Sequence, residues 1–214
     1  MNISNLDELK KKHQNQLKKS LSNDLWYHAT TLDKLKSLLE GVDVNYNAGN
    51  PLDFGPGFYL SNSLEASKEY VDRMRSYDVS DSLFLNNSSD MSEPVVVTYK
   101  IPDLWQLFQK DMLFEVFPLF TNEFAKFVLK CRLDPSKRAH NYKLIFGAQT
   151  DSNPLNVVES FKNKCISEDE AINELKKSTS GKQLYIGDQS ICDQLVICDI
   201  IKRDKETKEW QHVK

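Results

Sequence analysis

Two short segments contain the residues whose types and spacing suit chemistry on a bound ligand. Residues 25–30 (LWYHAT) place His28 after an aromatic run and before small residues, so its side chain can face a cleft. Residues 53–60 (DFGPGFYL) combine glycines, which permit close backbone approach, with Phe58 and Tyr59, which must face opposite sides of a strand. A hydrogen-bonded structural histidine and core packing beside a tight turn explain the same residues, and residue types alone leave both interpretations open.

The motifs of several enzyme classes are missing. The sequence contains no G-x-S-x-G elbow, no Walker loop, no H-E-x-x-H and no G-x-G-x-x-G after a strand-like run. The triplet at 53–55 (DFG) matches a kinase magnesium-binding motif, but the remaining kinase motifs do not accompany it. The four cysteines form no C-x-x-C pair and lack the paired histidine spacing of a zinc site: Cys131, Cys165, Cys192 and Cys198. We therefore expect no metal.

Composition indicates a globular protein of ordinary type. A chain of 214 residues with 40% hydrophobic and 28% charged residues can bury a core without metals or disulfides. The net charge of −3 disfavours a duplex nucleic-acid binder, and we interpret the lysine clusters at 10–19 and 202–208 as solvated surface. The N-terminus has no apolar signal region and no apolar run is long enough to span a bilayer, which predicts a cytoplasmic protein without a membrane partner. Delivery into a host cell by a specialised route would leave no visible signal.

The elements that must position these segments alternate irregularly between strands and helices. Periodicity and caps predict strands at 25–28, 58–60, 94–101, 142–147 and 183–186, and helices at 32–40, 64–75, around 124–128, at 153–162 and at 167–177. Residues 43–57 and 76–93 read as loops, and 191–201 as a short helix followed by a final strand. No regular βαβ rhythm appears, so the sequence predicts an α+β fold.

Taken together, the two segments resemble two of the three signature motifs of ADP-ribosyltransferases of the His-Tyr-Glu class. They resemble more closely a family of small bacterial proteins of unknown function related to that class, whose motifs read Tyr-His-Gly-Ser/Thr and Asp-Phe-Gly-Lys-Gly-Phe-Tyr-Leu-Thr. The counterparts here are residues 27–30 (YHAT) and 53–61 (DFGPGFYLS). Further blocks follow in the same order over roughly 25–197, at 124–132, 142–147, 166–171 and 182–184.

The resemblance implies an ADP-ribosyltransferase-like split pair of β-sheets with flanking helices around an NAD cleft. It places this domain at 23–201, with a helical extension at 1–22 and a polar tail at 202–214. By this resemblance His28 would hydrogen-bond the ribose distal to adenosine, the Ala29 backbone would hold the carboxamide, and Tyr59 would stack on the nicotinamide. The residues expected to bind NAD are His28, Ala29, Thr30, Phe54, Gly57 and Tyr59.

The third motif departs from the family pattern, because Gln183 stands where a glutamate is usual. A glutamine accepts a hydroxyl hydrogen bond but cannot act as a general base. The expected catalytic residues are therefore His28, Tyr59 and Gln183, with Asp188 or Glu65 as candidate helper carboxylates. Ala29 also replaces the usual glycine, which requires a negative φ at that position.

The function implied by the resemblance is mono-ADP-ribosylation. The enzyme would cleave NAD at the nicotinamide–ribose bond and transfer ADP-ribose to a macromolecule, a protein in preference to a nucleic acid, as a bacterial or phage toxin or effector. An antitoxin or immunity partner would fit such a role, and no metal is needed. The alternatives are a module that binds NAD or ADP-ribose without chemistry, and an NAD glycohydrolase that uses water as acceptor.

Overall fold

A computed structural model describes most of the chain. The described residues are 19, 21–22, 25–72, 93–101, 113–117, 121–150, 154–176 and 178–213, with backbone alone at 178–180. The expected helical extension at 1–22 and the loop at 76–93 therefore lie almost entirely outside the described residues. Within them, no helix combines the length and apolar character needed to cross a membrane.

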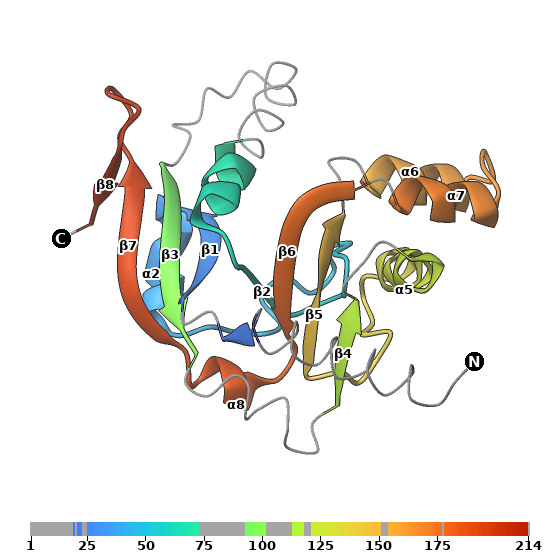
Figure 1. Cartoon of the computed structure of the whole chain (residues 1–214), viewed down its shortest axis with the longest axis horizontal. Coiled ribbons are helices and arrows are strands. Elements are labelled where there is room, and N and C mark those ends of the chain that lie inside the picture. The colour runs from blue at the N-terminus through green and yellow to red at the C-terminus, as the bar shows by residue number, and fades with distance from the viewer. Residues whose placement is uncertain are drawn as a thin grey trace.

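The described strands form one eight-stranded mixed sheet (Figure 1). Its order is β4-β5-β6-β2-β1-β3-β7-β8, and the pairing is antiparallel everywhere except between β4 and β5. The bounds are β1 (Leu25–Thr31), β2 (Phe58–Ser61), β3 (Pro94–Lys100), β4 (Phe114–Phe117), β5 (Leu144–Thr150), β6 (Ser178–Ile186), β7 (Val196–Arg203) and β8 (Trp210–His212). With the helices below, this confirms the α+β class.

The helices have clear local start signals. Ser167 and Glu170 form a reciprocal capping box at the start of α7, which lies within the helix predicted at 167–177, and the Thr121 side chain caps α5. Helical residues also occupy 64–72, within the predicted helix. The remaining bounds are α2 (Leu32–Glu40), α5 (Asn122–Leu133), α6 (Pro154–Lys162), α7 (Glu168–Leu175) and α8 (Gln189–Cys192).

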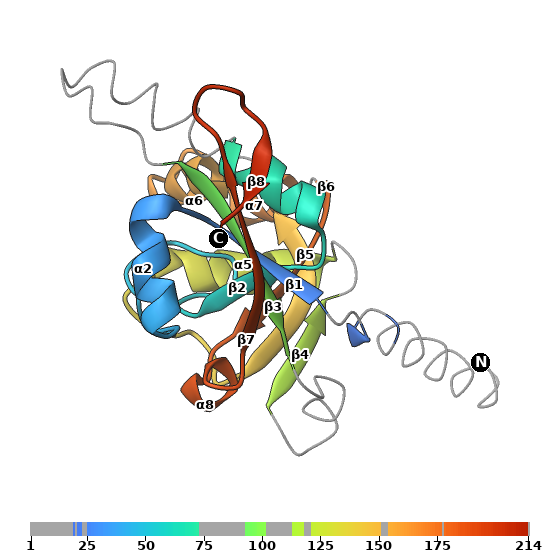
Figure 2. The ribbon, with the colours of Figure 1, turned by 90° about the vertical axis from the view of Figure 1, so that its left-hand side faces the viewer.

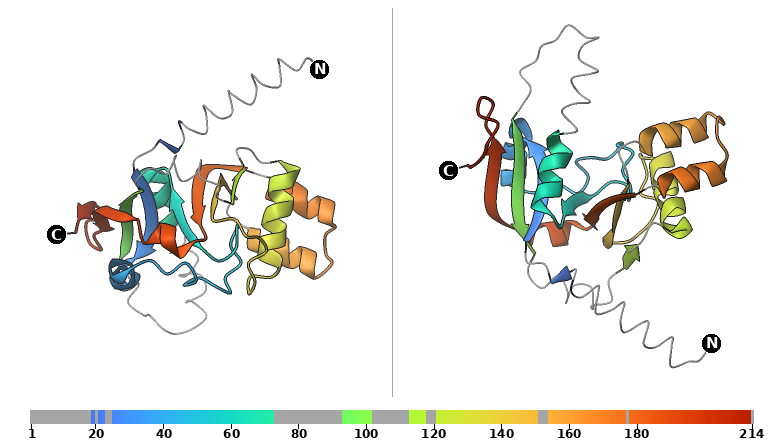
Figure 3. Two further views of the ribbon diagram at one scale, coloured as in Figure 1. Left: turned by 90° about the horizontal axis from the view of Figure 1, so that it is seen from below. Right: turned by 45° about the horizontal axis from the view of Figure 1, so that its top comes forward.

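Two apolar clusters cover opposite faces of β5 and β6. Side chains alternate along a strand, so Leu184 and Ile186 join one cluster while Tyr185 joins the other. The first cluster lies toward β1 and β3, where α2 packs (Figure 2). The second is closed by α5, α6 and α7, drawn yellow to orange on the side of the molecule away from the C-terminus (Figure 3). The strands between the two clusters are consequently buried on both faces.

The sheet is weakly joined between β1 and β2. These strands share the single Cα pair Tyr27↔Ser61, whereas β1 pairs with β3 along all seven of its residues. Figure 1 accordingly shows β1, β3, β7 and β8 grouped on one side and β4, β5 and β6 on the other, with β2 between them. The part of β1 that follows Tyr27 therefore runs beside β2 without a ladder.

Several expected boundaries differ from the structure. Strand β4 was not predicted, because a short parallel edge strand is defined only by its pairing with β5. The strand expected at 183–186 begins earlier, at Ser178, so that Gly181 lies inside β6. The expected polar tail at 202–214 instead completes β7 and adds β8, since the backbone of Trp210–His212 pairs with that of Ile201–Arg203. Polar side chains on an edge hairpin look like a tail in the sequence, because hydrogen bonds between backbones leave no compositional signal.

Candidate functional site

His28 on β1 contacts β2 at the place where the two strands separate. Its Nδ1 lies 2.9 Å from the carbonyl oxygen of Tyr59, and its ring stacks on Phe58 with centroids 4.5 Å apart. Burial lowers the pKa of His28, and the bond to Tyr59 only partly offsets that effect. A carbonyl can only accept, so the neutral ring carries its proton on Nδ1. Its Nε2 has no hydrogen-bond partner among the described residues and presents a lone pair that can accept a hydroxyl hydrogen.

Tyr59 on β2 uses its hydroxyl to hold the preceding loop. The hydroxyl donates to the carbonyl of Gly55 at 2.7 Å and accepts from the amide of Phe54 at 3.0 Å. Burial raises the pKa of Tyr59 well above its ordinary value, and the Asp53 carboxylate adds to the shift, so the phenol stays neutral. Because both functions of the hydroxyl are satisfied within the loop, a ligand would meet the ring of Tyr59 rather than its oxygen.

The loop before β2 is tightly fixed around two glycines. Gly55 has a φ of +77°, and a Cβ at Gly57 would come within 2.1 Å of the Tyr185 ring. The Phe54 ring is completely enclosed and lies nearly parallel to Tyr59, with centroids 6.3 Å apart. Phe54 and Gly57 were both expected to bind NAD, yet Phe54 packs against Tyr59 with an enclosed ring that offers no surface to a ligand, and Gly57 packs against Tyr185.

Ala29 and Thr30 continue β1 beyond the last pair with β2. Ala29 is half-buried opposite Val96, and Thr30 is buried opposite Val95. In the described part of the chain, the only residues other than glycine with positive φ are Lys164 and Lys208. The expectation that the Ala29 backbone keeps a negative φ is therefore confirmed.

Gln183 on β6 lies directly opposite Ser61, and Tyr185 lies opposite Tyr59. Directly paired residues share a face of the sheet, so Gln183 and Tyr59 project to the same side. The Gln183 side chain is buried, and its Nε2 donates to Asp53 Oδ2 at 2.8 Å and to the carbonyl of Ala148 at 3.0 Å. No described residue hydrogen-bonds its Oε1. The third expected site residue is thus connected to Tyr59 through the loop that begins at Asp53, and it makes no direct contact with His28.

The buried Asp53 side chain connects several elements around the site, and this role was not predicted from the sequence. Its carboxylate pairs with Arg132 of α5 at 2.7 Å and also accepts from the backbone and hydroxyl of Thr150. Burial raises the pKa of Asp53, but the Arg132 guanidinium and the Thr150 hydrogen bonds outweigh it and hold the pKa below the ordinary 3.8. A signal was present, because Asp53 is the one charged residue in the stretch 51–60 (PLDFGPGFYL), which is otherwise apolar apart from glycines and a tyrosine.

Two further side chains secure the same loop from the segment before β5. His140 Nε2 donates to the carbonyl of Phe54 at 2.8 Å, while its Nδ1 accepts from the amide of Tyr142 at 3.0 Å. Arg138 donates to the carbonyl of Pro56 at 3.2 Å and to that of Gly187 at 2.7 Å. Nothing in the sequence marks these residues, because their role depends on contacts with a loop more than 80 positions away.

The two carboxylates considered as helpers are engaged elsewhere. Asp188 forms an ion pair of 2.7 Å with Lys143 and caps α8 through the amide of Ser190. Glu65 is largely exposed and pairs with Lys68 one turn along its own helix. Among the described residues, Asp53 is therefore the carboxylate that contacts Gln183. Both of its oxygens already accept hydrogen bonds.

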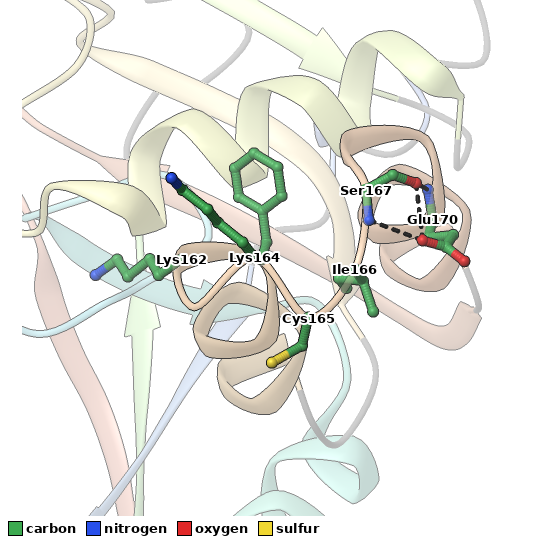
Figure 4. A pocket seen from close by; sticks show the side chains of 7 residues that line it. Lys162, Lys164, Cys165, Ile166, Ser167 and Glu170 are labelled. Carbon is green, nitrogen blue, oxygen red and sulfur yellow. Dashed lines mark hydrogen bonds between the residues drawn. The ribbon is translucent and has the colours of Figure 1, made fainter.

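A hollow of about 570 Å³ lies at the turn between α6 and α7, away from these residues (Figure 4). Phe161 and Ile166 give it apolar walls, and Ser167 and Glu170 bond each other at its edge rather than facing a ligand. None of the expected site residues lines it. We therefore assign the candidate site to the junction of β1, β2 and β6.

Comparison with models of protein families matches residues 27–197 to the family described as "Protein of unknown function (DUF3990)". The matched stretch contains β2, β6, the loop that starts at Asp53 and β1 from Tyr27 onward, and hence every residue of the candidate site. Searches of curated proteins and of solved structures find no match.

Proposed function

The chain belongs to the DUF3990 family of proteins of unknown function, and from the geometry of its site we propose that it is a mono-ADP-ribosyltransferase that uses NAD. In this proposal the junction of β1 and β2 is the split of an ADP-ribosyltransferase-like fold, and NAD lies along it. Three residues from adjacent strands form the site: His28, Tyr59 and Gln183.

The observation that carries the proposal is the bond from His28 Nδ1 to the carbonyl of Tyr59. It joins the first two motif residues across the split and fixes the imidazole tautomer. The Nε2, which no described residue bonds, is then an acceptor for a ribose hydroxyl, while the neutral Tyr59 ring is an aromatic surface for the nicotinamide. An aromatic face attracts the cationic pyridinium of intact NAD more strongly than it attracts the neutral nicotinamide that leaves.

The chemistry requires little from acid–base groups. The C–N glycosidic bond breaks with its electron pair going to nicotinamide, which leaves neutral, and C1′ of the ribose becomes an oxocarbenium-like centre. A nucleophile of the acceptor then bonds to C1′ and releases its proton to solvent, because Gln183 cannot take it. Orientation of the ribose by His28 and Gln183 would supply most of the acceleration.

The proposal is tested by label transfer from radiolabelled NAD to lysate macromolecules. His28→Ala and Tyr59→Ala should abolish transfer, whereas His212→Ala should not, since that histidine is exposed on β8 and pairs with Asp199. Transfer that persists in both site variants would reject the assignment.

The amide at position 183 favours a second candidate, a module that binds NAD or ADP-ribose without catalysing transfer. It predicts binding in calorimetry with no nicotinamide release over long incubation. Release of nicotinamide together with free ADP-ribose, without added acceptor, would instead indicate NAD glycohydrolase activity.

We further propose a protein acceptor and a role as a bacterial or phage toxin or effector. The net charge of −3 supports a protein over duplex nucleic acid as the acceptor. Expression in a bacterial host should then slow growth, and His28→Ala should relieve it. Recovery of growth by co-expressing a neighbouring gene product would identify an antitoxin or immunity partner.

A further inference from the structure

The carboxylate of Asp53 accepts five hydrogen bonds in a buried position. Its Oδ1 receives Arg132 Nε at 2.9 Å, Arg132 Nη2 at 2.7 Å and the Thr150 hydroxyl at 2.7 Å. Its Oδ2 receives the Thr150 amide at 3.1 Å and Gln183 Nε2 at 2.8 Å. Each partner is a donor at these distances, so the site is built for an ionised carboxylate.

This arrangement determines the orientation of the Gln183 amide. Both hydrogens of Nε2 are directed at groups that can only accept, the Asp53 carboxylate and the carbonyl of Ala148. A flipped amide would place Oε1 against the same two acceptors and leave it without a donor. The oxygen must therefore point away from Asp53, on the face of the sheet that also carries Tyr59.

We propose that Asp53 is a positioning residue that presents Gln183 Oε1 as a fixed hydrogen-bond acceptor and excludes an ionised carboxylate from position 183. That the accepted group is a ribose hydroxyl of NAD rests on the proposed function. The exclusion of a carboxylate rests on the contacts of Asp53 alone. The buried Asp53 carboxylate therefore requires an amide at position 183. Replacing Gln183 by glutamate would not simply restore a catalytic base, because the ionised form of that glutamate is excluded.

The charged and titratable groups that face Asp53 in the described part of the chain lie on α5 and β2. Arg132 on α5 is its cationic partner, and the neighbouring Cys131 has a pKa raised to about 12 by burial and by the Asp53 charge. Tyr59 on β2 is also neutral at physiological pH. Replacing the amide nitrogen of Gln183 by an ionised oxygen would leave one described cation for two buried anions in contact.

In a Gln183→Glu variant, the introduced carboxyl should consequently hold a proton. Its hydroxyl could then donate to Asp53 as the amide does, with its carbonyl oxygen facing the site. The folded-state pKa of the introduced carboxyl would be raised above the unfolded value of about 4.3, so the variant would keep full stability below that pH and lose it as the pH rises through the folded pKa.

The first experiment needs no NAD. The Gln183→Glu variant carrying ¹³C-labelled glutamate is titrated by NMR, and its unfolding by urea is compared with that of Gln183→Met from about pH 5 to pH 8.5. We expect the introduced glutamate to have a pKa at least about one unit above the ordinary value, and an Asp53→Asn change in the same background to lower it again. A pKa of that glutamate at or below the ordinary value would overturn the proposal, as would a variant that fails to fold at pH 5 while Gln183→Met folds. Folding at pH 5 that is lost at neutral pH would support it.

The second experiment tests positioning through a double-mutant cycle on NAD affinity. We expect Asp53→Asn and Gln183→Met each to weaken binding by roughly fivefold, and the double variant to bind no more weakly than Gln183→Met alone. Additive losses would show that Asp53 does not act through Gln183. If the wild type does not bind NAD, the proposed function fails, while the titration of the Gln183→Glu variant still decides whether Asp53 excludes a carboxylate.

Discussion

Replacements at Tyr59 separate the structural role of its hydroxyl from the proposed role of its ring. The hydroxyl donates to Gly55 and accepts from Phe54, so Tyr59→Phe leaves a backbone carbonyl and a backbone amide without their partner. Leaving such groups unsatisfied costs about 2 kcal/mol in total, which corresponds to roughly 4–8 °C in Tm for a chain of this size. The ring stays in place, so NAD affinity should change by no more than about threefold.

Tyr59→Leu removes the aromatic face as well. Loss of stacking and of the attraction to the pyridinium should cost about 1.5–3 kcal/mol of binding free energy, roughly ten- to a hundredfold in Kd. Calorimetric titration with NAD measures this loss, and thermal unfolding measures stability for both variants. Tyr142→Phe is the matched control, because its half-buried hydroxyl donates to Glu115 at 3.0 Å without contacting the loop.

Two outcomes would refute this reasoning. Equal loss of NAD affinity in Tyr59→Phe and Tyr59→Leu would mean that the ligand uses the hydroxyl, contrary to its two bonds within the loop. Wild-type affinity in Tyr59→Leu would mean that NAD does not meet the ring. Either result would move the candidate site away from Tyr59 while leaving the fold unchanged.

Three further replacements test the supports of the site. Arg132→Met should lower the free energy of unfolding by about 3–5 kcal/mol in urea, because it leaves a buried carboxylate unpaired, and a loss below about 1 kcal/mol would contradict the buried pair. Burial lowers the pKa of His140 below 6.5, so its neutral form stabilises the fold above that value and this stability is lost as the pH falls through the folded pKa. The wild type should therefore lose more stability than His140→Gln between pH 6.5 and about pH 5, and parallel pH profiles would exclude this role. Gly57→Ala should cost about 1–3 kcal/mol and weaken NAD binding, since the added Cβ meets the Tyr185 ring. Gly49 has a φ of +92° and open space around its Cα, so Gly49→Ala should cost stability through backbone strain while leaving NAD affinity unchanged. Equal losses of NAD affinity in the two glycine variants would contradict a local effect at Gly57.

Local signals account for most of the elements that the sequence predicted correctly. The capping box of Ser167 and Glu170, the β-branched run of β3 and the leucine spacing of α2 are properties of neighbouring residues, so they can be recognised without the fold. Strand β4 and the hairpin of β7 and β8 escaped prediction because long-range pairing defines them. The unexpected start of β6 before Gly181 has the same origin.

The sequence by itself determined the α+β class, the residues His28, Tyr59 and Gln183 as a candidate set, and the presence of an amide where a carboxylate was expected. Only the tertiary structure decided how those residues are held. The tautomer of His28 and the orientation of the Gln183 amide depend on partners 31 and 130 positions away, and side-chain hydrogen bonds over such separations leave no local pattern. The sequence places Asp53, which fixes the Gln183 amide, in a loop. Its burial and its pairing with Arg132 arise only from the packing of α5, β5 and β6 against that loop.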